Sequence, residues 1–410
     1  MNKYDLIIVG AGPAGMMAAI TAARDKKSVL LLEKLSKIGI KLKSTGGGRC
    51  NLTNTLSNEE FMARFGRDGR FLSPALDALD YKALIDFFKH LGVESHAPDG
   101  YRVFPITHSS STVIDAMHQE MLHLGVKICP SQKVETLLQE NQKVLGVNTL
   151  HDTYYAENII IASGGMGYPD LGAEGDGYTM AKAVGHKVTD IFPAMMPLKT
   201  KERWVEQCRA DTIAKVKMHV DIKKYKKLTA TGDLIFTKKG IRGPVVLDFS
   251  REITPLLRKF DEVPILMNLT KGMNEEQIRQ HIKKQLKQNP HQNVVELIET
   301  LLPHALAVEL CNMQNATLTL GWNRLSGETR DGLIKLLVAT PLTINGHDGF
   351  NMAMITRGGI SLKEIDPYTM QSKKVEGLYF CGEVMNIDGP CGGYNLQWSF
   401  SSGFLAGKLK

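Results

Sequence analysis

Three glycines near the start of the chain have the spacing of a turn that binds phosphate. Gly10, Gly12 and Gly15 follow the apolar run at residues 6–9 in the pattern Gly-x-Gly-x-x-Gly. The first glycine permits a tight turn, the second lets a pyrophosphate approach the backbone, and the third lets a helix pack closely on the preceding strand. Because a helix beginning there directs free N–H groups and a positive dipole end at the turn, this stretch predicts a dinucleotide site.

An acidic residue at the expected distance supports this interpretation. Glu33 comes 23 residues after Gly10, at the end of the apolar run 29–32, where a carboxylate can hydrogen-bond a ribose hydroxyl. Its negative charge would repel a 2′-phosphate, so FAD or NAD is favoured over NADP. A glycine turn between unrelated elements is the alternative, but strand, helix, second strand and acid are all in order.

Three other segments combine glycine with the ends of apolar runs. Residues 45–51 read Thr-Gly-Gly-Gly-Arg-Cys-Asn, which cannot form a stable helix interior and predicts a loop that lies against a ligand. The strand predicted at 157–161, which ends in three isoleucines, leads into Ala-Ser-Gly-Gly, and residues 377–383 are expected to form a third strand that ends in Gly-Glu. Since ligands of doubly wound sheets lie at the carboxyl ends of strands, these segments are expected to meet around one nucleotide.

With these segments the chain resembles a known family of flavoproteins. It is similar to the two-dinucleotide-fold flavoproteins of the glutathione-reductase type, and within them to the HI0933-like (YhiN/BaiN-type) FAD-dependent oxidoreductases. The motifs that carry the resemblance are Gly10-x-Gly12-x-x-Gly15 with Glu33, residues 45–51, residues 161–165, and residues 377–383 with Gly-Gly-Tyr-Asn at 392–395. One departure is Ala-Ser-Gly at 162–164, where the wider superfamily often has Ala-Thr-Gly.

The resemblance implies an α/β fold with a Rossmann-like FAD-binding domain that is split in the sequence. We expect this domain to comprise residues 1–192 and 346–410. A basic, β-barrel-like domain is expected at 193–270 and 331–345, and a small helical domain at 271–330.

The resemblance also implies which residues contact FAD. Glu33 is assigned to the adenosine ribose and Gly382-Glu383 to the ribityl chain. The predicted cofactor-binding residues are Gly10, Gly12, Pro13, Ala14, Gly15, Glu33, Lys34, Lys41, Gly46, Gly47, Gly48, Arg49, Cys50, Asn51, Ala162, Ser163, Gly164, Gly382, Glu383, Gly392, Gly393, Tyr394 and Asn395. No metal site is predicted.

The positive charge of the chain is concentrated in one region. Residues 193–250 contain 13 Lys and Arg against 6 Asp and Glu, an excess equal to the net charge of +7 for all 410 residues. Such a region is either a solvated face or the contact surface of a polyanionic partner.

The six cysteines form no C-x-x-C pair, which argues against a disulfide reductase and against zinc. The composition is that of a cytoplasmic protein without membrane spans.

These observations favour an FAD-dependent oxidoreductase whose flavin is reduced by an external donor, NAD(P)H being the expected one. A second complete Gly-x-Gly-x-x-Gly with an acid is missing from the sequence, so a dedicated nicotinamide domain is not expected.

Family members include proteins linked to the reduction of a uridine in ribosomal RNA to dihydrouridine, so RNA and small molecules are both open as substrates. Such a reaction needs a general acid, for which Cys391 is a weak candidate beside a structural role, and Cys50 has the same ambiguity. The alternative is an RNA-binding or assembly protein that uses FAD structurally; the oligomeric state is not predicted.

Two local predictions concern secondary structure. The run 244–249, Pro-Val-Val-Leu-Asp-Phe, is a strand candidate in the inserted region. The runs 126–129, 134–138 and 144–150 are expected to form a small antiparallel element.

Overall fold

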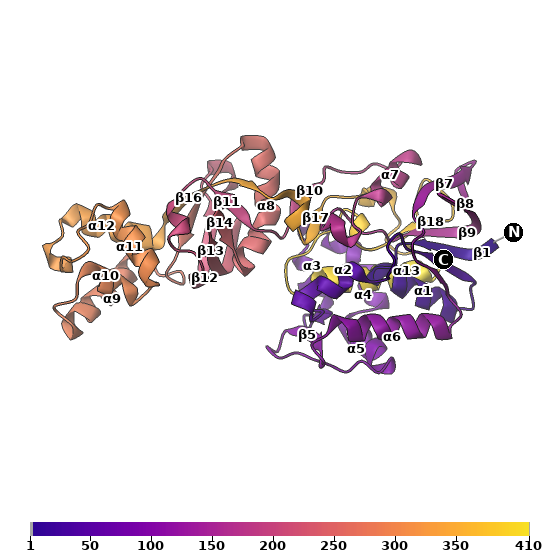
Figure 1. The fold of residues 1–410 in the computed structure, drawn as a ribbon, viewed down its shortest axis with the longest axis horizontal. Coiled ribbons are helices and arrows are strands. Elements are labelled where there is room, and N and C mark those ends of the chain that lie inside the picture. The colour runs from indigo at the N-terminus through magenta and orange to yellow at the C-terminus, as the bar shows by residue number, and fades with distance from the viewer. Residues whose placement is uncertain (1–2, 410) are drawn as a thin grey trace. The chain divides into compact units, whose positions relative to one another are not determined.

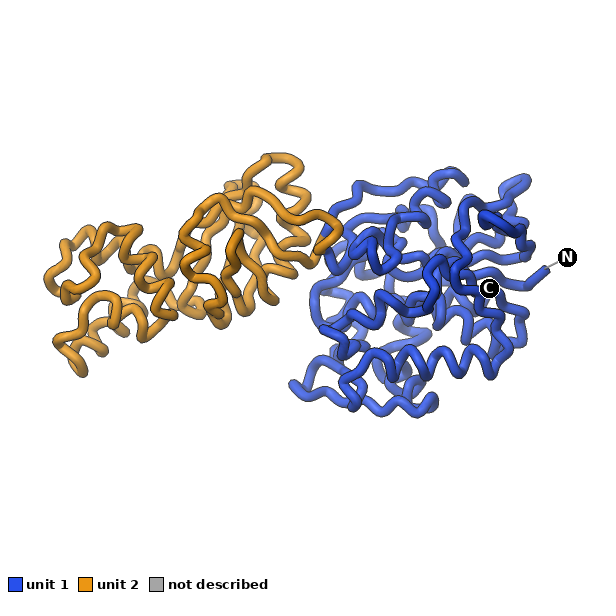
Figure 2. The backbone as a smooth tube through the Cα atoms, viewed as in Figure 1, with its two compact units in different colours: residues 1–193, 353–410 blue, residues 194–352 orange. Residues whose placement is uncertain are grey.

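The computed structural model describes residues 3–409. It divides the chain into two compact units (Figure 2). The first unit contains the chain up to Pro193 and again from Ala353 onward, and the second contains Ala194–Met352. The split of the second unit into a barrel part and a helical part stays a prediction, because one continuous apolar cluster joins the barrel strands and the helices.

A seven-stranded sheet organises the first unit, with the order β6-β2-β1-β9-β8-β7 and β18 paired to β9. Its parallel strands are β1 (Lys3–Val9), β2 (Val29–Leu32), β6 (Lys127–Cys129), β9 (Thr153–Ile161) and β18 (Leu378–Phe380). Strands β7 (Val134–Glu140) and β8 (Lys143–Thr149) continue it in antiparallel sense. The four residues of β2 are all buried, as expected for a strand covered on both faces.

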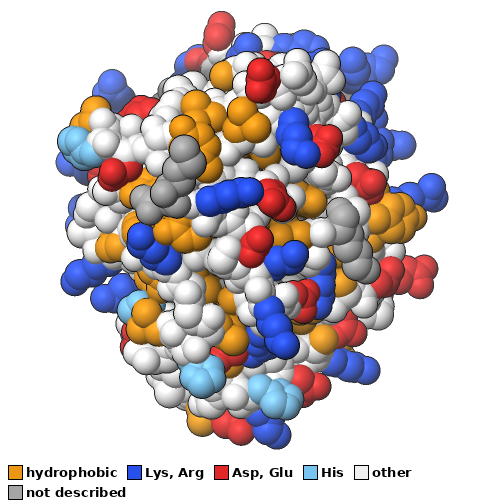
Figure 3. All heavy atoms as spheres, turned by 90° about the vertical axis from the view of Figure 1, so that its right-hand side faces the viewer, with side chains coloured by type: hydrophobic (Ala, Val, Ile, Leu, Met, Phe, Trp, Pro, Cys, Tyr) orange, Lys and Arg blue, Asp and Glu red, His pale blue; other side chains and the backbone are white. Residues whose placement is uncertain are grey.

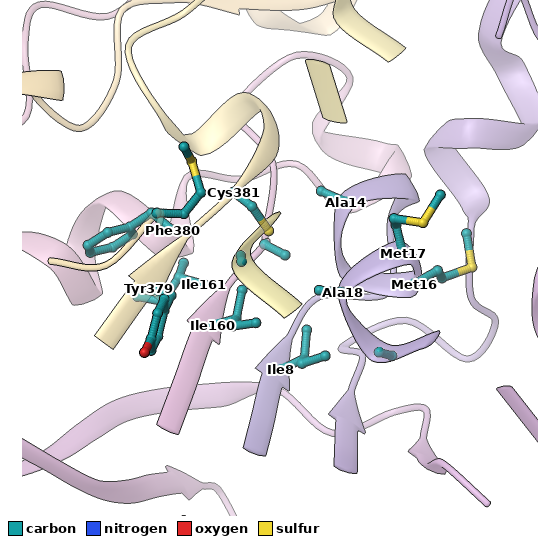
Figure 4. Packing of buried hydrophobic residues seen from close by; sticks show 14 of the residues in the cluster. Ile8, Ala14, Met16, Met17, Ala18, Ile160, Ile161, Tyr379, Phe380 and Cys381 are labelled. Atoms are coloured by element: carbon teal, nitrogen blue, oxygen red, sulfur yellow. The ribbon is translucent and has the colours of Figure 1, made fainter. Parts of the chain in front are cut away.

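Two helices at opposite ends of the sequence cover this sheet. Helix α1 (Pro13–Arg24) packs along α13 (Tyr394–Gly407), and both are almost completely buried. Figure 4 shows α1 beside the strands, with Ile8, Ile160 and Ile161 lying in the apolar layer. Close packing requires small residues, because a Cβ on Gly403 would lie 2.3 Å from the carbonyl oxygen of Ala14.

The remaining elements of the first unit lie around this core. Its other helices are α2 (Ile40–Ser44), α3 (Asn58–Ala63), α4 (Ser73–Ala78), α5 (Tyr81–His90), α6 (Ser110–His123) and α7 (Asp176–Ala183). Strands β3 (Thr53–Asn54), β5 (Arg102–Pro105) and β4 (Ser95–His96) form a three-stranded sheet, and β10 (Phe192–Ala194) pairs with β17 (Ile355–Arg357).

The second unit is a closed six-stranded barrel with helices (Figure 1). Its strands, in barrel order, are β11 (Leu198–Thr200), β14 (Gly240–Arg242), β13 (Thr229–Thr237), β12 (Thr212–Val220), β15 (Val263–Asn268) and β16 (Thr340–His347). The helices are α8 (Pro244–Phe260), α9 (Glu275–Gln288), α10 (Val294–Glu299), α11 (His304–Met313) and α12 (Gly327–Val338). Helices α9 and α10 begin with capping boxes at Asn274 and Asn293.

Two local predictions are wrong. The run 244–249 forms the first turns of α8 instead of a strand: Pro244 occupies the first helical position, and buried Val245, Phe249 and Ile253 recur with helical spacing. The run 126–129 belongs to β6, which pairs in parallel with β2, so only β7 and β8 form the expected antiparallel element. A short apolar run does not reveal its partner strand.

Among the described residues, no helix is long and apolar enough to cross a membrane. On the face of the molecule in Figure 3, Lys and Arg side chains are interspersed with Asp and Glu.

Candidate functional site

Four strands of the first sheet end side by side. In the parallel register Val9 is opposite both Leu32 and Ile161, and Ile161 is also opposite Phe380. The residues that follow these strands, Gly10, Glu33, Ala162 and Cys381, therefore lie along one edge of the sheet. Two of these strands come from the first 33 residues and one from the last 35, so this edge joins distant parts of the sequence.

At two positions of the turn after β1, the packing of the chain itself requires glycine. Gly10 has a φ of +104°, and a Cβ there would lie 2.8 Å from the carbonyl oxygen of Ala162. A Cβ on Gly15 would lie 1.9 Å from the carbonyl oxygen of Gly10. Any side chain at these two positions would displace backbone, so the strand, turn and helix are locked in close contact.

Gly12 has a different surrounding. Apart from the adjoining backbone, nothing in residues 3–409 lies within 4 Å of a Cβ built on this residue, and the same is true of Gly47, Gly48 and Gly164. Gly12 caps α1, whose first turn receives no side-chain hydrogen bond and begins with Pro13 and then Ala14. The side-chain oxygen of Ser163 is buried and has no hydrogen-bond partner among the described residues. An open cradle of glycine backbone with a helix N-terminus and an orphaned hydroxyl fits a bound dinucleotide.

Glu33 closes the glycine turn. Its Oε2 accepts a hydrogen bond from the N–H of Ala11 at 2.8 Å, and its Oε1 accepts one from the N–H of Leu35 at 2.9 Å. The Nζ of the neighbouring Lys34 lies 2.7 Å from Oε2 of Glu174 and 2.5 Å from Oδ2 of Asp176. Although burial lowers the pKa of Lys34, these two carboxylates raise it above its ordinary value overall. Lys34 therefore pairs with the start of α7 and with the loop residue Glu174 before it.

A second charged pair ties the two ends of the sequence together. Lys41 Nζ lies 2.8 Å from Oε2 of Glu383, and Oε1 of the same carboxylate accepts the N–H of Thr356 at 2.9 Å. The Thr356 hydroxyl in turn accepts the N–H of Met166 at 2.7 Å. Lys41, Gly382 and Glu383 are thus brought to one place together with the segment after Gly164. A Cβ on Gly165 would lie 2.7 Å from Oε1 of Glu383.

The loop 45–51 contacts the loop 389–395. With its amide oriented to satisfy its neighbours, Asn51 accepts the N–H of Gly393 at 2.9 Å, and Asn54 donates to the carbonyl of Gly392 at 2.9 Å. The Arg49 guanidinium lies 5.2 Å from the Phe104 ring centroid, and its Nε donates to the carbonyl of Gly46. The two glycine-rich loops, 45–51 and 389–395, therefore lie next to each other.

The two cysteines in these loops differ. Cys50 is fully buried, and burial raises the pKa of its thiol to about 12, which fits a packing role. Cys391 is half-buried in the turn that precedes α13. In the same place the Tyr101 hydroxyl contacts the Tyr394 hydroxyl, and the Asn395 amide bridges back to Gly389. Gly393 caps the N-terminus of α13 with a φ of +86°.

The sequence did not single out three residues of this edge. Thr356, Tyr101 and Asn54 reach it through contacts between segments far apart in the chain. Thr356 is followed by Arg-Gly-Gly, and this glycine pair could have marked it. For Tyr101, no local pattern distinguishes the residue from other tyrosines.

The fold and this edge define a dinucleotide-binding flavoprotein. The sequence matches the family described as HI0933-like protein Rossmann domain over residues 4–409, and the chain belongs to this family. It is 30% identical to a 3-dehydro-bile acid delta(4,6)-reductase of Clostridium scindens, over 100% of this chain and 98% of the relative. It is 29% identical to a ribosomal RNA dihydrouridine synthase of Escherichia coli, over 98% of this chain and 96% of that protein.

Solved structures agree on the fold. A 3-ketosteroid Δ4-(5α)-dehydrogenase from Rhodococcus jostii aligns with a TM-score of 0.51 and 16% identity, covering 100% of this chain and 96% of that one. A 3-ketosteroid Δ1-dehydrogenase from Sterolibacterium denitrificans aligns with a TM-score of 0.54 and 12% identity, covering 100% and 99%. The protein is an FAD-dependent oxidoreductase, as the sequence motifs predicted.

Proposed function

We propose that the protein reduces a carbon–carbon double bond conjugated to a carbonyl group, with NAD(P)H as the source of electrons. The names of the two full-length relatives support this class. A 3-dehydro-bile acid with delta(4,6) double bonds carries a ketone in conjugation with them. Formation of dihydrouridine saturates the C5–C6 bond of uridine, which is conjugated to the C4 carbonyl. The two reactions share this chemistry although their substrates differ in size and charge.

The observation that carries the proposal is the edge where the four strands end. Gly12 and the first turn of α1 would bind the pyrophosphate, Glu33 would face the adenosine ribose, and Gly382-Glu383 would lie along the ribityl chain. Ala162, Ser163, Gly164 and the loops 46–51 and 392–395 would surround the rest of the cofactor. FAD, when bound there, supplies hydride chemistry.

The chain must then supply a proton. Hydride addition to the carbon β to the carbonyl leaves negative charge on the α carbon and the carbonyl oxygen, and protonation of the α carbon completes the saturated product. The side chains available near the Gly392 turn are the Tyr101–Tyr394 phenol pair and Cys391. The N-terminus of α13, which begins at Tyr394, would stabilise negative charge that develops beside it.

The test uses the purified holoprotein under anaerobic conditions. NADPH or NADH is added while the visible flavin absorbance is followed, and the reduced protein is then mixed with a 3-oxo-4,6-diene steroid or with ribosomal RNA. We expect bleaching by one of the nucleotides and recovery of absorbance with one of the two acceptors, together with a product that has gained two hydrogens by mass spectrometry. A flavin that is not reduced by either donor would overturn the proposal in favour of a structural FAD.

A further inference from the structure

We infer that the helices of the second unit form a groove that binds the phosphate backbone of single-stranded RNA. This α9–α12 groove is a cavity of about 590 Å³ lined by residues of α9, of α12 and of the segment before α12. The inference rests on the proposed function, because it names RNA as the substrate class. The volume of the groove lies within the range of ordinary ligand sites, about 300–1,000 Å³.

The floor of the groove is apolar and rigid. Ile282, Trp322 and Ile334 line it and are 5%, 6% and 1% exposed. All three belong to the apolar cluster that the helices share with the barrel. The floor is therefore part of the folded core, and it presents only a small, fixed apolar surface to an occupant of the groove.

The rim of the groove is cationic. Arg279, Lys283 and Lys287 follow one another at intervals of four residues along α9, and Arg330 joins them from α12. Residues four apart lie on the same face of a helix, about 6 Å apart along its axis. A flexible strand can present successive phosphates to such a row, whereas a compact anion would use only one or two of its members.

Three of the four cationic side chains of this row have no ion-pair partner within residues 3–409. Lys283, Lys287 and Arg330 form no ion pair with any residue in the described part of the chain, residues 3–409. Like charges at this spacing destabilise a helix, so the row is unfavourable unless an external anion occupies it. Arg279 is the exception, because its Nη1 lies 2.9 Å from Oδ1 of Asp331 and so neutralises the carboxylate that lines the groove.

The other lysine-rich segment of this unit is a weaker candidate. It follows β12 and contains Lys223, Lys224, Lys226 and Lys227. There Lys226 lies 3.7 Å from the Asp221 carboxylate, and the Tyr225 ring accepts contacts from neighbouring lysines. Part of its charge is thus already used within the fold, which favours the α9–α12 groove as the place where RNA is held.

The test measures binding of a fluorescein-labelled oligouridine to the full-length holoprotein by fluorescence anisotropy at several salt concentrations. The groove variant carries Lys283→Glu, Lys287→Glu and Arg330→Glu. The matched control carries Lys284→Glu, Arg324→Glu and Lys335→Glu, which make the same total charge change on α9, on the segment before α12 and on α12, at residues that do not line the groove. We expect the groove variant to weaken binding ~10-fold or more and to lower the salt slope by about 2, because each phosphate neutralised on a single strand contributes ~0.7 to that slope.

Equal weakening by both variants, or none by the groove variant, would overturn the inference. Should the Glu variant fail to fold, Lys283→Gln, Lys287→Gln and Arg330→Gln replace it, with the same expected direction. Trp322 gives a local signal: oligouridine should change tryptophan fluorescence, and Trp322→Phe should abolish that change while leaving the other two tryptophans in place.

Two further probes identify the occupant. Inorganic phosphate and uridine monophosphate should compete with oligouridine only weakly, and equal competition by the mononucleotide would replace RNA with a small nucleotide. An acidic peptide that competes as well as RNA would likewise contradict the inference. The proposed function is judged separately, because NAD(P)H reduction of the flavin and its reoxidation by a small enone do not depend on this groove.

Discussion

Lys41 and Glu383 form an ion pair of 2.8 Å although 342 positions separate them in the sequence. Their side chains are 23% and 20% exposed, so the pair is partly withdrawn from water. It joins the segment after the first dinucleotide motif to the strand end contributed by the last quarter of the chain. The cofactor edge therefore exists only when both parts of the discontinuous unit have folded together.

Breaking this pair should destabilise the first unit. Lys41→Met leaves the partly buried Glu383 carboxylate with the Thr356 N–H as its one remaining hydrogen-bond donor among residues 3–409, and we expect a loss of roughly 1–3 kcal/mol in the free energy of unfolding. The double variant Lys41→Met with Glu383→Gln should recover part of this loss. Denaturant unfolding of the wild type, both single variants and the double variant measures the coupling, and strictly additive losses would contradict it.

Gly12→Val should empty the FAD site without unfolding the protein. Apart from the adjoining backbone, nothing in the described residues lies within 4 Å of a Cβ on Gly12, so the new side chain would occupy the volume that we assign to the pyrophosphate. We expect FAD content to fall by about 10-fold or more, since a branched side chain blocks close approach of phosphate to the backbone. The melting temperature of the FAD-free variant should stay within a few degrees of that of the wild-type apoprotein.

Gly15→Ala is the contrasting variant. A Cβ there would overlap the Gly10 carbonyl oxygen at 1.9 Å, so the helix and strand would have to separate. We expect destabilisation of about 1–3 kcal/mol, the usual cost of overpacking. Equal loss of stability in Gly12→Val and Gly15→Ala would show that Gly12 has a structural role instead of a ligand-facing one.

Acid should weaken the fold through His186. This side chain is buried, its Nδ1 lies 3.1 Å from Glu364 and its Nε2 lies 2.7 Å from the Ser372 hydroxyl. Burial lowers the pKa of His186, while the Glu364 carboxylate only partly opposes this effect. The unfolded chain therefore binds a proton at about pH 6.5 that the folded chain does not, so stability should fall as the pH drops below that value.

The comparison for this prediction is His186→Gln. This variant should be less stable than the wild type at pH 8, but its stability should depend less on pH between 8 and 5. The Glu364 carboxylate adds a second, more acidic loss: burial raises its pKa, but the hydrogen bonds from Lys374 and the Lys187 N–H lower it overall. Identical pH profiles for His186→Gln and the wild type would contradict the assignment.

Tyr101→Phe should slow reoxidation of the flavin by substrate without slowing its reduction by NAD(P)H. The Tyr101 hydroxyl contacts that of Tyr394 beside Gly392, so its removal takes a proton donor or its support from this turn. We expect reoxidation of the reduced protein by substrate to slow by ~10²-fold or more while reduction by NAD(P)H keeps its rate. Cys391→Ala is the paired variant: if it alone slows reoxidation, the proton comes from the thiol and the tyrosine pair has no part in it.

Local pattern was sufficient to predict the strand ends but not the contacts that join them. The turn at Gly10, Gly12 and Gly15 and the strand before Gly382 are marked by glycine at the end of an apolar run. The pairing of Lys41 with Glu383 and of Tyr101 with Tyr394 depends on how distant segments meet, which no periodicity records.

Helix α8 shows that local sequence pattern can also fail to predict the secondary structure of a single segment. Two valines after Gly243 and Pro244 favour a strand by propensity, yet the buried face of this segment repeats with helical spacing as far as Leu257. Six residues were too few to distinguish the two periods. Packing against the barrel, which involves residues far along the chain, decides the outcome.

The most direct test of the central claim is single-turnover reoxidation of the NAD(P)H-reduced holoprotein by a conjugated enone, with the flavin and the product followed together. If the edge at Gly10, Glu33, Ala162 and Gly382 holds a catalytic FAD, one equivalent of substrate should gain two hydrogens for each flavin reoxidised. Purified protein that takes up no FAD, or a reduced flavin that no enone and no ribosomal RNA reoxidises, would contradict it.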